Sequence, residues 1–333
     1  MKTKRPRLLK VLSFWLGVLV LLGLCAEGAL RYRGFRFDPY RYYKRFGANF
    51  EADEIRYYEG DAALFWRFRP SNVIHDFWVS TATINSEGFR GPEFRWSKKP
   101  GTFRVVCLGD SGTFGWNVGD DEGYPARLEA LLTQAMPGRR VEVVNMGVPG
   151  YSSYQGRRLV EADVVRMSPD VIVFSYGRND HNDTVYLTDR QRRRRPAALV
   201  DLQDVLLESR LYQWAFMKVA VRMYKTTVHE FVVNGPKQAV RVPLDDYEDN
   251  LRSAAAAARR LGARILFLPR AQWPQYNETM RRVAGQTGAG YVDLSLQKGD
   301  RELIDFMHGE HPGPDAYRRL AGIIASRIMR PNE

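Results

Sequence analysis

A serine between two glycines is the first residue whose setting could do chemistry. Ser111 stands in the run Gly-Asp-Ser-Gly at 109–112, directly after the apolar run 104–108. A serine at such a strand-to-helix turn can present its hydroxyl as a nucleophile, and its own N–H lies near a helix start, where developing negative charge is favoured. Gly-Asp-Ser alone is common turn chemistry, so its position after a strand is what indicates a catalytic role.

Two later turns could supply hydrogen-bond donors to a negatively charged oxygen. Gly147 follows the apolar run 141–144, and Asn179 follows the run 170–176. Because the carboxyl ends of parallel strands line one crevice, we expect the N–H groups of Ser111 and Gly147 to converge with the Asn179 carboxamide. Removing one such oxyanion donor typically costs about 3 kcal/mol of transition-state stabilisation. Taken singly, the glycine is a turn residue and the asparagine a loop cap, so the prediction rests on their joint register.

A nucleophilic serine needs a base, and the candidates are few. The chain has five histidines, at His75, His181, His229, His308 and His311. Only the last two follow the last predicted strand, which places them at the expected edge of the sheet. Asp305 stands three residues before His308, and a carboxylate so placed can accept from Nδ1–H while Nε2 faces the serine. His308, His311 and Asp305 therefore join Ser111 as candidate catalytic residues.

Together, these four blocks resemble the SGNH/GDSL hydrolases. They are Ser111 in Gly-Asp-Ser, Gly147 in Asn-Met-Gly-Val-Pro-Gly, Asn179 in Gly-Arg-Asn-Asp and a C-terminal histidine, in that order over residues 102–325. Each block is weak singly and specific jointly. The resemblance implies a flavodoxin-like sandwich and ester hydrolysis or acyl transfer without a metal. It extends to Asn-Ser-Glu-Gly-Phe-Arg-Gly at 85–91, which is similar to bacterial membrane-anchored members but by itself indicates tight turns or a plain loop.

The last block departs from the family pattern, which resembles Asp-x-x-His-Pro followed by a helix. His311 precedes a proline, and Pro314 then marks a helix start, so the second half of the pattern fits His311. The residue three before His311 is His308, however, and Asp305 has the required spacing only to His308. We expect His311 to be the base, with His308 as the alternative and Asp305 as the orienting acid in either case.

Regular alternation of strands and helices after residue 100 positions these residues. Apolar, strand-like runs lie at 104–108, 141–144, 170–176, 264–268 and 291–294, and helical spacing lies at 124–136, 154–167 and 245–261. This alternation predicts a parallel sheet covered on both faces, that is, a three-layer α/β/α sandwich. Residues 181–243 are predicted to form a helical insertion over the active-site rim, and the arginine run 192–195 within it fits a solvated basic loop equally well.

The N-terminus predicts a membrane helix. A basic cluster at 2–10 precedes an uncharged run at 11–26, which reaches spanning length of about 20 residues if Glu27 is tolerated. The basic cluster favours a cytoplasmic N-terminus and an exported body, although arginines also follow the run. A cleaved signal with a small-x-small site at 26–28 and a buried core helix are the alternatives. We expect an anchor at 1–30, a juxtamembrane extension packed on the core at 31–100, and the hydrolase domain at 101–333.

Composition sets bounds on other classes of function. The chain has 333 residues and a formal net charge of +12, which favours anionic partners without choosing among them. The two cysteines fall in apolar runs, so they indicate neither a disulfide framework nor a metal site. No metal constellation, P-loop spacing or dinucleotide fingerprint is present, and we predict no cofactor. A nucleic-acid binder is disfavoured by the membrane segment and by the lack of a recognition motif.

The predicted function is that of a membrane-anchored serine esterase with its catalytic domain on the periplasmic or extracellular side. Its candidate substrates are O-acyl groups of envelope glycans or lipids, which rests on location and on the family resemblance. Transfer of the acyl group to cell-surface polysaccharide is one alternative. A catalytically inactive scaffold of the cell envelope is the other, suggested by the imperfect histidine block.

Overall fold

The computed structural model describes residues 5–35, 57–61, 63–77, 80–184, 188–193, 202, 205–206, 208–223, 239–297 and 299–330. The second half of the arginine run 192–195, His229 and most of residues 31–56 lie outside the described residues.

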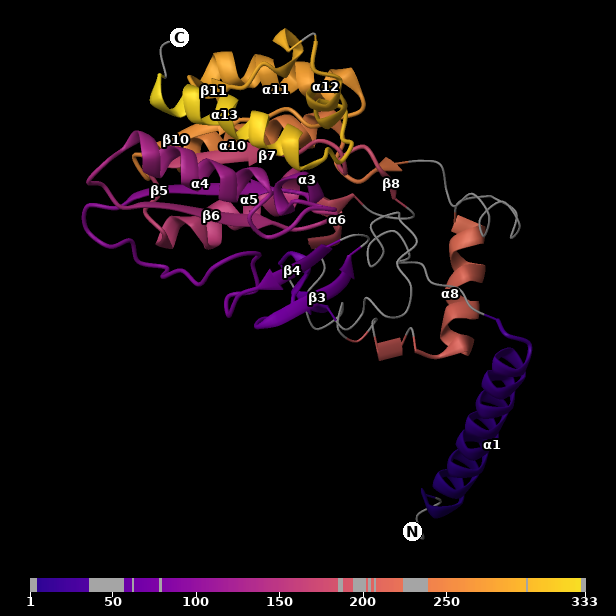
Figure 1. The fold of residues 1–333 in the computed structure, drawn as a ribbon. Coiled ribbons are helices and arrows are strands. Elements are labelled where there is room, and N and C mark those ends of the chain that lie inside the picture. The colour runs from indigo at the N-terminus through magenta and orange to yellow at the C-terminus, as the bar shows by residue number, and fades with distance from the viewer. Residues whose placement is uncertain are drawn as a thin grey trace.

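Five parallel strands form the central sheet (Figure 1). They are β5 (Phe103–Gly109), β6 (Val141–Gly147), β7 (Val171–Ser175), β10 (Arg264–Phe267) and β11 (Gly290–Tyr291). Their spatial order is β11-β10-β7-β5-β6, and every neighbouring pair is parallel. This is the flavodoxin-like order, in which the direction of winding reverses between β5 and β7 and creates a ligand crevice beyond their carboxyl ends. The predicted parallel sheet is confirmed.

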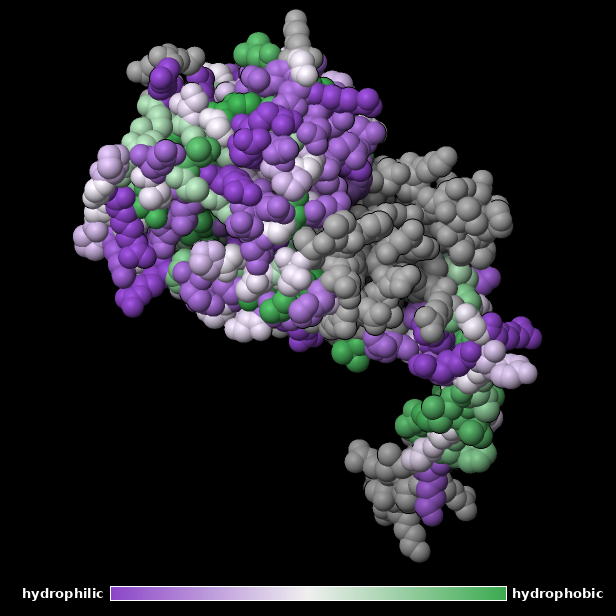
Figure 2. All heavy atoms as spheres, in the orientation of Figure 1, coloured by the Kyte–Doolittle hydropathy of each residue, from purple (hydrophilic) through white to green (hydrophobic). Residues whose placement is uncertain are grey.

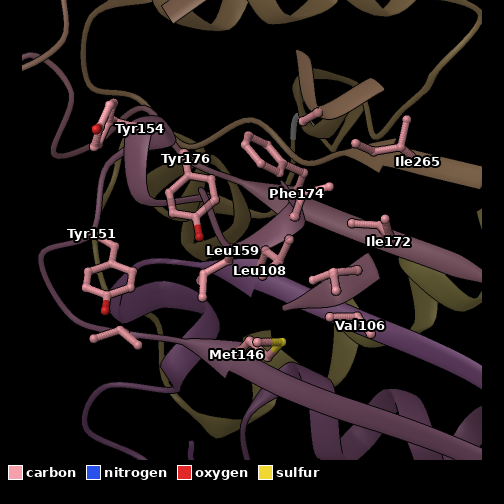
Figure 3. Close-up of a cluster of buried hydrophobic side chains, with 14 of the residues drawn as sticks. Val106, Leu108, Met146, Tyr151, Tyr154, Leu159, Ile172, Phe174, Tyr176 and Ile265 are labelled. Atoms are coloured by element: carbon pink, nitrogen blue, oxygen red, sulfur yellow. The ribbon is translucent and has the colours of Figure 1, made fainter. Parts of the chain in front are cut away.

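Helices cover both faces of this sheet (Figure 1). One face packs on α5 (Ser153–Ala162), α10 (Leu244–Arg260) and α11 (Pro274–Thr287), and the other on α4 (Tyr124–Ala135), α12 (Arg301–Met307) and α13 (Pro314–Met329). β5 is buried throughout, and its successive side chains alternate between the two cores. Figure 3 shows one core, with Val106 and Leu108 of β5 beside Phe174 of β7. The predicted three-layer sandwich is therefore correct.

Two expected elements end earlier than the sequence predicted. The helix expected over 154–167 stops at Ala162, and a separate 3₁₀ turn, η2 (Val164–Arg166), follows it. The strand expected over 291–294 is only two residues long and is followed by the 3₁₀ turn η3 (Leu294–Leu296). The Asp293 side chain accepts from the N–H of Ser295 at 3.1 Å. This cap draws the backbone into a turn and away from the sheet.

Residues 57–91 form two hairpins that the sequence pattern did not reveal. β1 (Tyr58–Asp61) pairs with β2 (Phe65–Phe68), and β3 (Asn72–Phe77) pairs with β4 (Ser80–Ile84), both antiparallel. The buried side chains of these hairpins share the hydrophobic core of α5 and α10. The segment 85–91 forms tight turns: the Asn85 side chain accepts from the N–H of Glu87 and of Phe89, each at 3.0 Å.

The N-terminal helix α1 (Arg5–Tyr32) projects from the body of the molecule (Figure 1). Its part from Lys10 to Tyr32 is long and apolar enough to cross a membrane and is not buried in the protein, so the buried core helix among the alternatives is contradicted. Figure 2 shows hydrophobic side chains along this projection.

The described parts of the insertion between β7 and β10 are β8 (Asp183–Thr184), α6 (Asp189–Arg193), α8 (Arg210–Met223) and β9 (Ala239–Val240). β8 pairs with β9 in an antiparallel bridge. The start of α8 contacts α1: the Glu27 carboxylate of α1 accepts from the N–H of Leu211 at 2.7 Å and from the N–H of Arg210 at 3.0 Å.

Candidate active site

The turn after β5 presents Ser111 at the start of a short helix, α3 (Ser111–Phe114). Asp110 caps this helix by accepting from the N–H of Gly112 at 2.8 Å. At the other end, the chain turns at Gly115, whose φ of 88° favours glycine. The Arg90 guanidinium donates to the carbonyl of Phe114 at 3.1 Å. The sequence motif at 85–91 thus contributes a buried cation that holds the end of the nucleophile helix.

The structure brings Ser111 and His311 together across 200 residues of chain. Nε2 of His311 lies 2.7 Å from Oγ of Ser111, within hydrogen-bonding distance. The imidazole stacks on the Trp116 ring, with 5.7 Å between centroids. His308 instead ends α12 as its C-cap and is exposed. Of the two candidate bases, the geometry favours His311.

Asp305 does not lie against either histidine. Its carboxylate is 3.6 Å from Nε of Arg301, and its side chain is 45% exposed. Within the described residues, it makes no side-chain hydrogen bond to His308 or His311. The reason is local: Asp305 sits on the helix α12, and the chain then reverses at Gly309, whose φ is 98°. The arrangement is a serine–histidine pair. Within the described residues, no carboxylate is hydrogen-bonded to the imidazole.

Gly147 lies close to the nucleophile helix, but its N–H is already used. That N–H donates to Oδ1 of Asn145 at 2.9 Å. A Cβ at position 147 would meet the backbone nitrogen of Phe114 at 2.3 Å and the carbonyl carbon of Thr113 at 2.7 Å. Gly147 therefore allows β6 to approach α3 closely, which differs from the expected role as an oxyanion donor.

We expect Gly147→Ala to lower kcat by about a hundredfold, because a displacement of about 1 Å in a catalytic group costs about that much. The added methyl collides with the α3 backbone, which cannot move without moving Ser111. Gly285→Ala in α11 is the matched control, since its Cβ would meet nothing within 4 Å. Steady-state ester hydrolysis and thermal melting of both variants test this. Wild-type kcat in Gly147→Ala would contradict it.

Asn179 lies beside the nucleophile turn, in the loop after β7. Its Nδ2 donates to the carbonyl of Tyr151 at 3.0 Å and is 3.5 Å from Oδ2 of Asp110. The second of these distances is at the limit of a hydrogen bond, so this proton is available to a ligand. Gly150, which precedes Tyr151 with a φ of 80°, makes no N–H hydrogen bond within the described residues. Sequence reasoning missed this glycine, although it stands in the same six-residue block as Gly147.

A buried ion pair supports the loop that carries Gly150. Nη2 of Arg241 lies 2.9 Å from Oδ2 of Asp189, and both side chains are almost fully buried. Nη1 of Arg241 donates to the Gly150 carbonyl at 2.6 Å. Asp189 in turn accepts from the hydroxyl of Ser152 at 2.7 Å. The Gly150 carbonyl is thus bonded to a buried ion pair, and removing one member of such a pair would leave a buried charge uncompensated.

The imidazole of His311 is held in its neutral form. Loss of hydration around the ring, then the positive charges of Arg270 and Arg178, lower the pKa of His311 to about 3. The residue as a whole is exposed, but its hydrogen bond to Ser111 is partly buried, and this shielded side is where the loss of water acts. Only the neutral imidazole can accept a proton from the serine. The base is therefore available at neutral pH.

Comparison with known proteins identifies the family of this chain. Residues 107–319 match the model of the GDSL-like lipase/acylhydrolase family. Similar solved structures include the enzyme LAE5 from the metagenome of Lake Arreo, at 19% identity over 69% of this chain and 97% of that one, with a TM-score of 0.43. TesA is 20% identical over 68% of this chain and 99% of that one, with a TM-score of 0.42.

A third is the acetylxylan esterase Axe2 from Geobacillus stearothermophilus, 21% identical over 68% of this chain and 94% of that one, with a TM-score of 0.42. Among curated proteins, none is significantly similar to this chain. The family match covers well over half of the chain and includes the end of β5, the Ser111 turn and the His311 loop. The chain belongs to the GDSL-like lipase/acylhydrolase family.

Proposed function

We propose that this protein is a serine esterase that cleaves acyl esters through Ser111 and His311. The observation that carries the proposal is the distance of 2.7 Å between Oγ of Ser111 and Nε2 of His311. His311 takes the hydroxyl proton as Oγ attacks the ester carbonyl, then returns it to the leaving alkoxide. Water, deprotonated by the same imidazole, adds to the acyl-enzyme and releases the acid. The neutral imidazole supplies the base for both steps.

We propose that three donors stabilise the tetrahedral oxyanion. The N–H of Ser111 stands at the N-terminus of α3, where the backbone amides favour negative charge. The second donor is Nδ2 of Asn179, and the third is the N–H of Gly150. Gly150 is preferred to Gly147 because the N–H of Gly147 is donated to Asn145. This set has the composition of an oxyanion hole, namely two backbone amides and one carboxamide.

We propose that α1 is retained as a membrane anchor. Cleavage after the small-x-small sequence at 26–28 would remove Glu27, which accepts hydrogen bonds from the first turn of α8. These hydrogen bonds between α1 and α8 support an anchor that stays attached. The intact mass of the protein extracted from membranes should include residues 10–32. A mature form that starts after residue 28 would contradict this.

The anchor suggests the class of substrate. A catalytic domain tethered at an exported face would meet O-acylated glycans and lipids of the cell envelope, and we propose these as its esters. Transfer of the acyl group to a sugar hydroxyl would pass through the same acyl-enzyme, so the acceptor alone distinguishes the two reactions. Release of free acetate from acetylated polysaccharide, without transfer to added sugar, is the result expected for an esterase.

A fluorophosphonate probe tests the proposed function directly. The detergent-solubilised full chain should lose ester hydrolysis as the probe reacts, and peptide mass spectrometry should place the adduct on Ser111. An adduct on another serine, or a folded protein that neither reacts nor hydrolyses p-nitrophenyl acetate, would overturn the proposal.

A further inference from the structure

We infer that Arg270 is a positioning residue that holds the loop before His311 in register with the Ser111 turn. The inference rests on the proposed function and concerns how its two reacting groups are kept together. Arg270 follows the carboxyl end of β10 and is fully buried. It lies at the same edge of the sheet as the turns after β5 and β7, and neither Ser111 nor His311 needs it for proton transfer.

The guanidinium of Arg270 joins the two loops by direct contacts. Its Nε donates to Oδ1 of Asp110, the residue before Ser111, at 2.7 Å. Its Nη1 donates to the carbonyl of Glu310, the residue before His311, at 2.7 Å. Its Nη2 donates to the carbonyl of Gly309 at 2.9 Å. One rigid, planar group thus spans the immediate neighbours of the nucleophile and of the base.

The packing around Arg270 leaves little freedom for another arrangement. Its guanidinium carbon lies 4.6 Å from the centre of the Phe306 ring, and Nη1 also donates to the Phe306 carbonyl at 3.2 Å. A Cβ at Gly112, in α3, would lie 2.4 Å from the guanidinium carbon. Only a glycine at 112 allows this contact. The cation is therefore enclosed between the nucleophile helix and the end of α12.

A buried ion pair is weak evidence of stabilisation, because desolvation offsets much of the attraction between the charges. Arg270 and Asp110 are both fully buried, so their geometric role is the more informative one. The imidazole of His311 has no carboxylate partner within the described residues that could orient it. Besides its stack on the Trp116 ring, its position depends on the backbone that precedes it, and Arg270 donates to that backbone at Gly309 and Glu310.

Two variants separate positioning from general destabilisation. Arg270→Lys keeps the positive charge but loses the planar guanidinium, whose nitrogens contact both loops. Arg270→Gln combined with Asp110→Asn removes both charges together and leaves no uncompensated buried carboxylate. Arg282→Gln is the control, since Arg282 pairs with Glu248 at the surface. The readouts are kcat and KM for p-nitrophenyl acetate, the pH profile of kcat/KM, and hydrogen–deuterium exchange of residues 306–311.

We expect both Arg270 variants to be folded, with kcat lowered about a hundredfold, KM within threefold of wild type, and faster exchange over 306–311. The acid limb should stay in place in Arg270→Lys. It should move up in the double variant, because one of the two cations that lower the pKa of His311 is gone, while the desolvation that lowers it most remains. The control should match wild type in every readout.

Unchanged kcat and unchanged exchange over 306–311 in both variants would overturn the inference. So would a loss of activity that merely follows the fraction of unfolded protein in both variants, with the acid limb unmoved in the double variant. The exchange measurement needs no catalysis, so it decides the inference even if wild type hydrolyses no ester. That last result would contradict the proposed function instead.

Discussion

Ser111→Ala should abolish ester hydrolysis while leaving the protein folded. We expect kcat to fall by roughly 10⁴-fold or more, because removing the nucleophile of a serine–histidine pair leaves only binding and oxyanion stabilisation. The fold should persist because the hydroxyl bonds to His311, whereas the cap of α3 is the side chain of Asp110. Initial rates with p-nitrophenyl acetate, together with circular dichroism melting, measure both parts of this expectation.

Ser86→Ala is the control for this variant. Ser86 is exposed, donates to Glu93 and lies outside the site, so its loss should leave kcat unchanged. The comparison also addresses the inactive scaffold. A scaffold would show the same negligible hydrolysis in wild type and Ser111→Ala, with both proteins folded. Equal and substantial hydrolysis in the two would instead move the nucleophile to another residue.

The position of the candidate site could be inferred from the sequence because parallel strands impose a simple rule. Side chains just beyond the carboxyl ends of the strands line one crevice. The rule located Ser111 after β5 and Asn179 after β7, on the two sides of the switch point. Apolar runs revealed the strands because both faces of this sheet are covered, so even β5 is buried throughout. The same rule applied to the end of β10 would have indicated Arg270, but a loop arginine is ordinarily solvated.

The role of Gly147 could not be read from the sequence. Gly147 and Gly150 stand three residues apart in one turn, and spacing does not reveal which N–H is free. The answer depends on the rotamer of Asn145, whose side chain accepts from Gly147. A side-chain orientation of this kind is decided by tertiary packing, which local sequence does not specify.

The expected pairing of Asp305 with a histidine failed for a different reason. The carboxylate of Asp305 lies one helical turn from Arg301 and pairs with that side chain instead of with a histidine. The reversal at Gly309 then carries the chain to His311. The hairpins at 58–84 were missed because their strands have only four to six residues. Such short segments give no sustained alternation of apolar and polar positions.

His311→Asn should reduce kcat nearly as much as Ser111→Ala, whereas His308→Asn should leave it within about twofold of wild type. The asparagine carboxamide is polar and smaller than the imidazole ring, and it cannot take up a proton near neutral pH. The serine therefore loses its base. His308 is exposed at the end of α12 and lies outside the pair. Because the two histidines stand three residues apart, they form a matched comparison in one loop. A large loss in His308→Asn with activity kept in His311→Asn would reverse the assignment.

Asp305→Asn decides whether the site works as a pair or as a triad. In a triad, replacing the acid by its amide lowers kcat by about 10⁴-fold, because the imidazole adopts the wrong tautomer. Here the Asp305 carboxylate faces Arg301 in an exposed ion pair, and such pairs contribute about 0–1 kcal/mol. We therefore expect Asp305→Asn to retain kcat within about threefold. Within the described residues, Asp305 does not contact the His311 imidazole. A loss approaching that of His311→Asn would therefore mean that the loop rearranges when substrate binds and brings Asp305 to the imidazole.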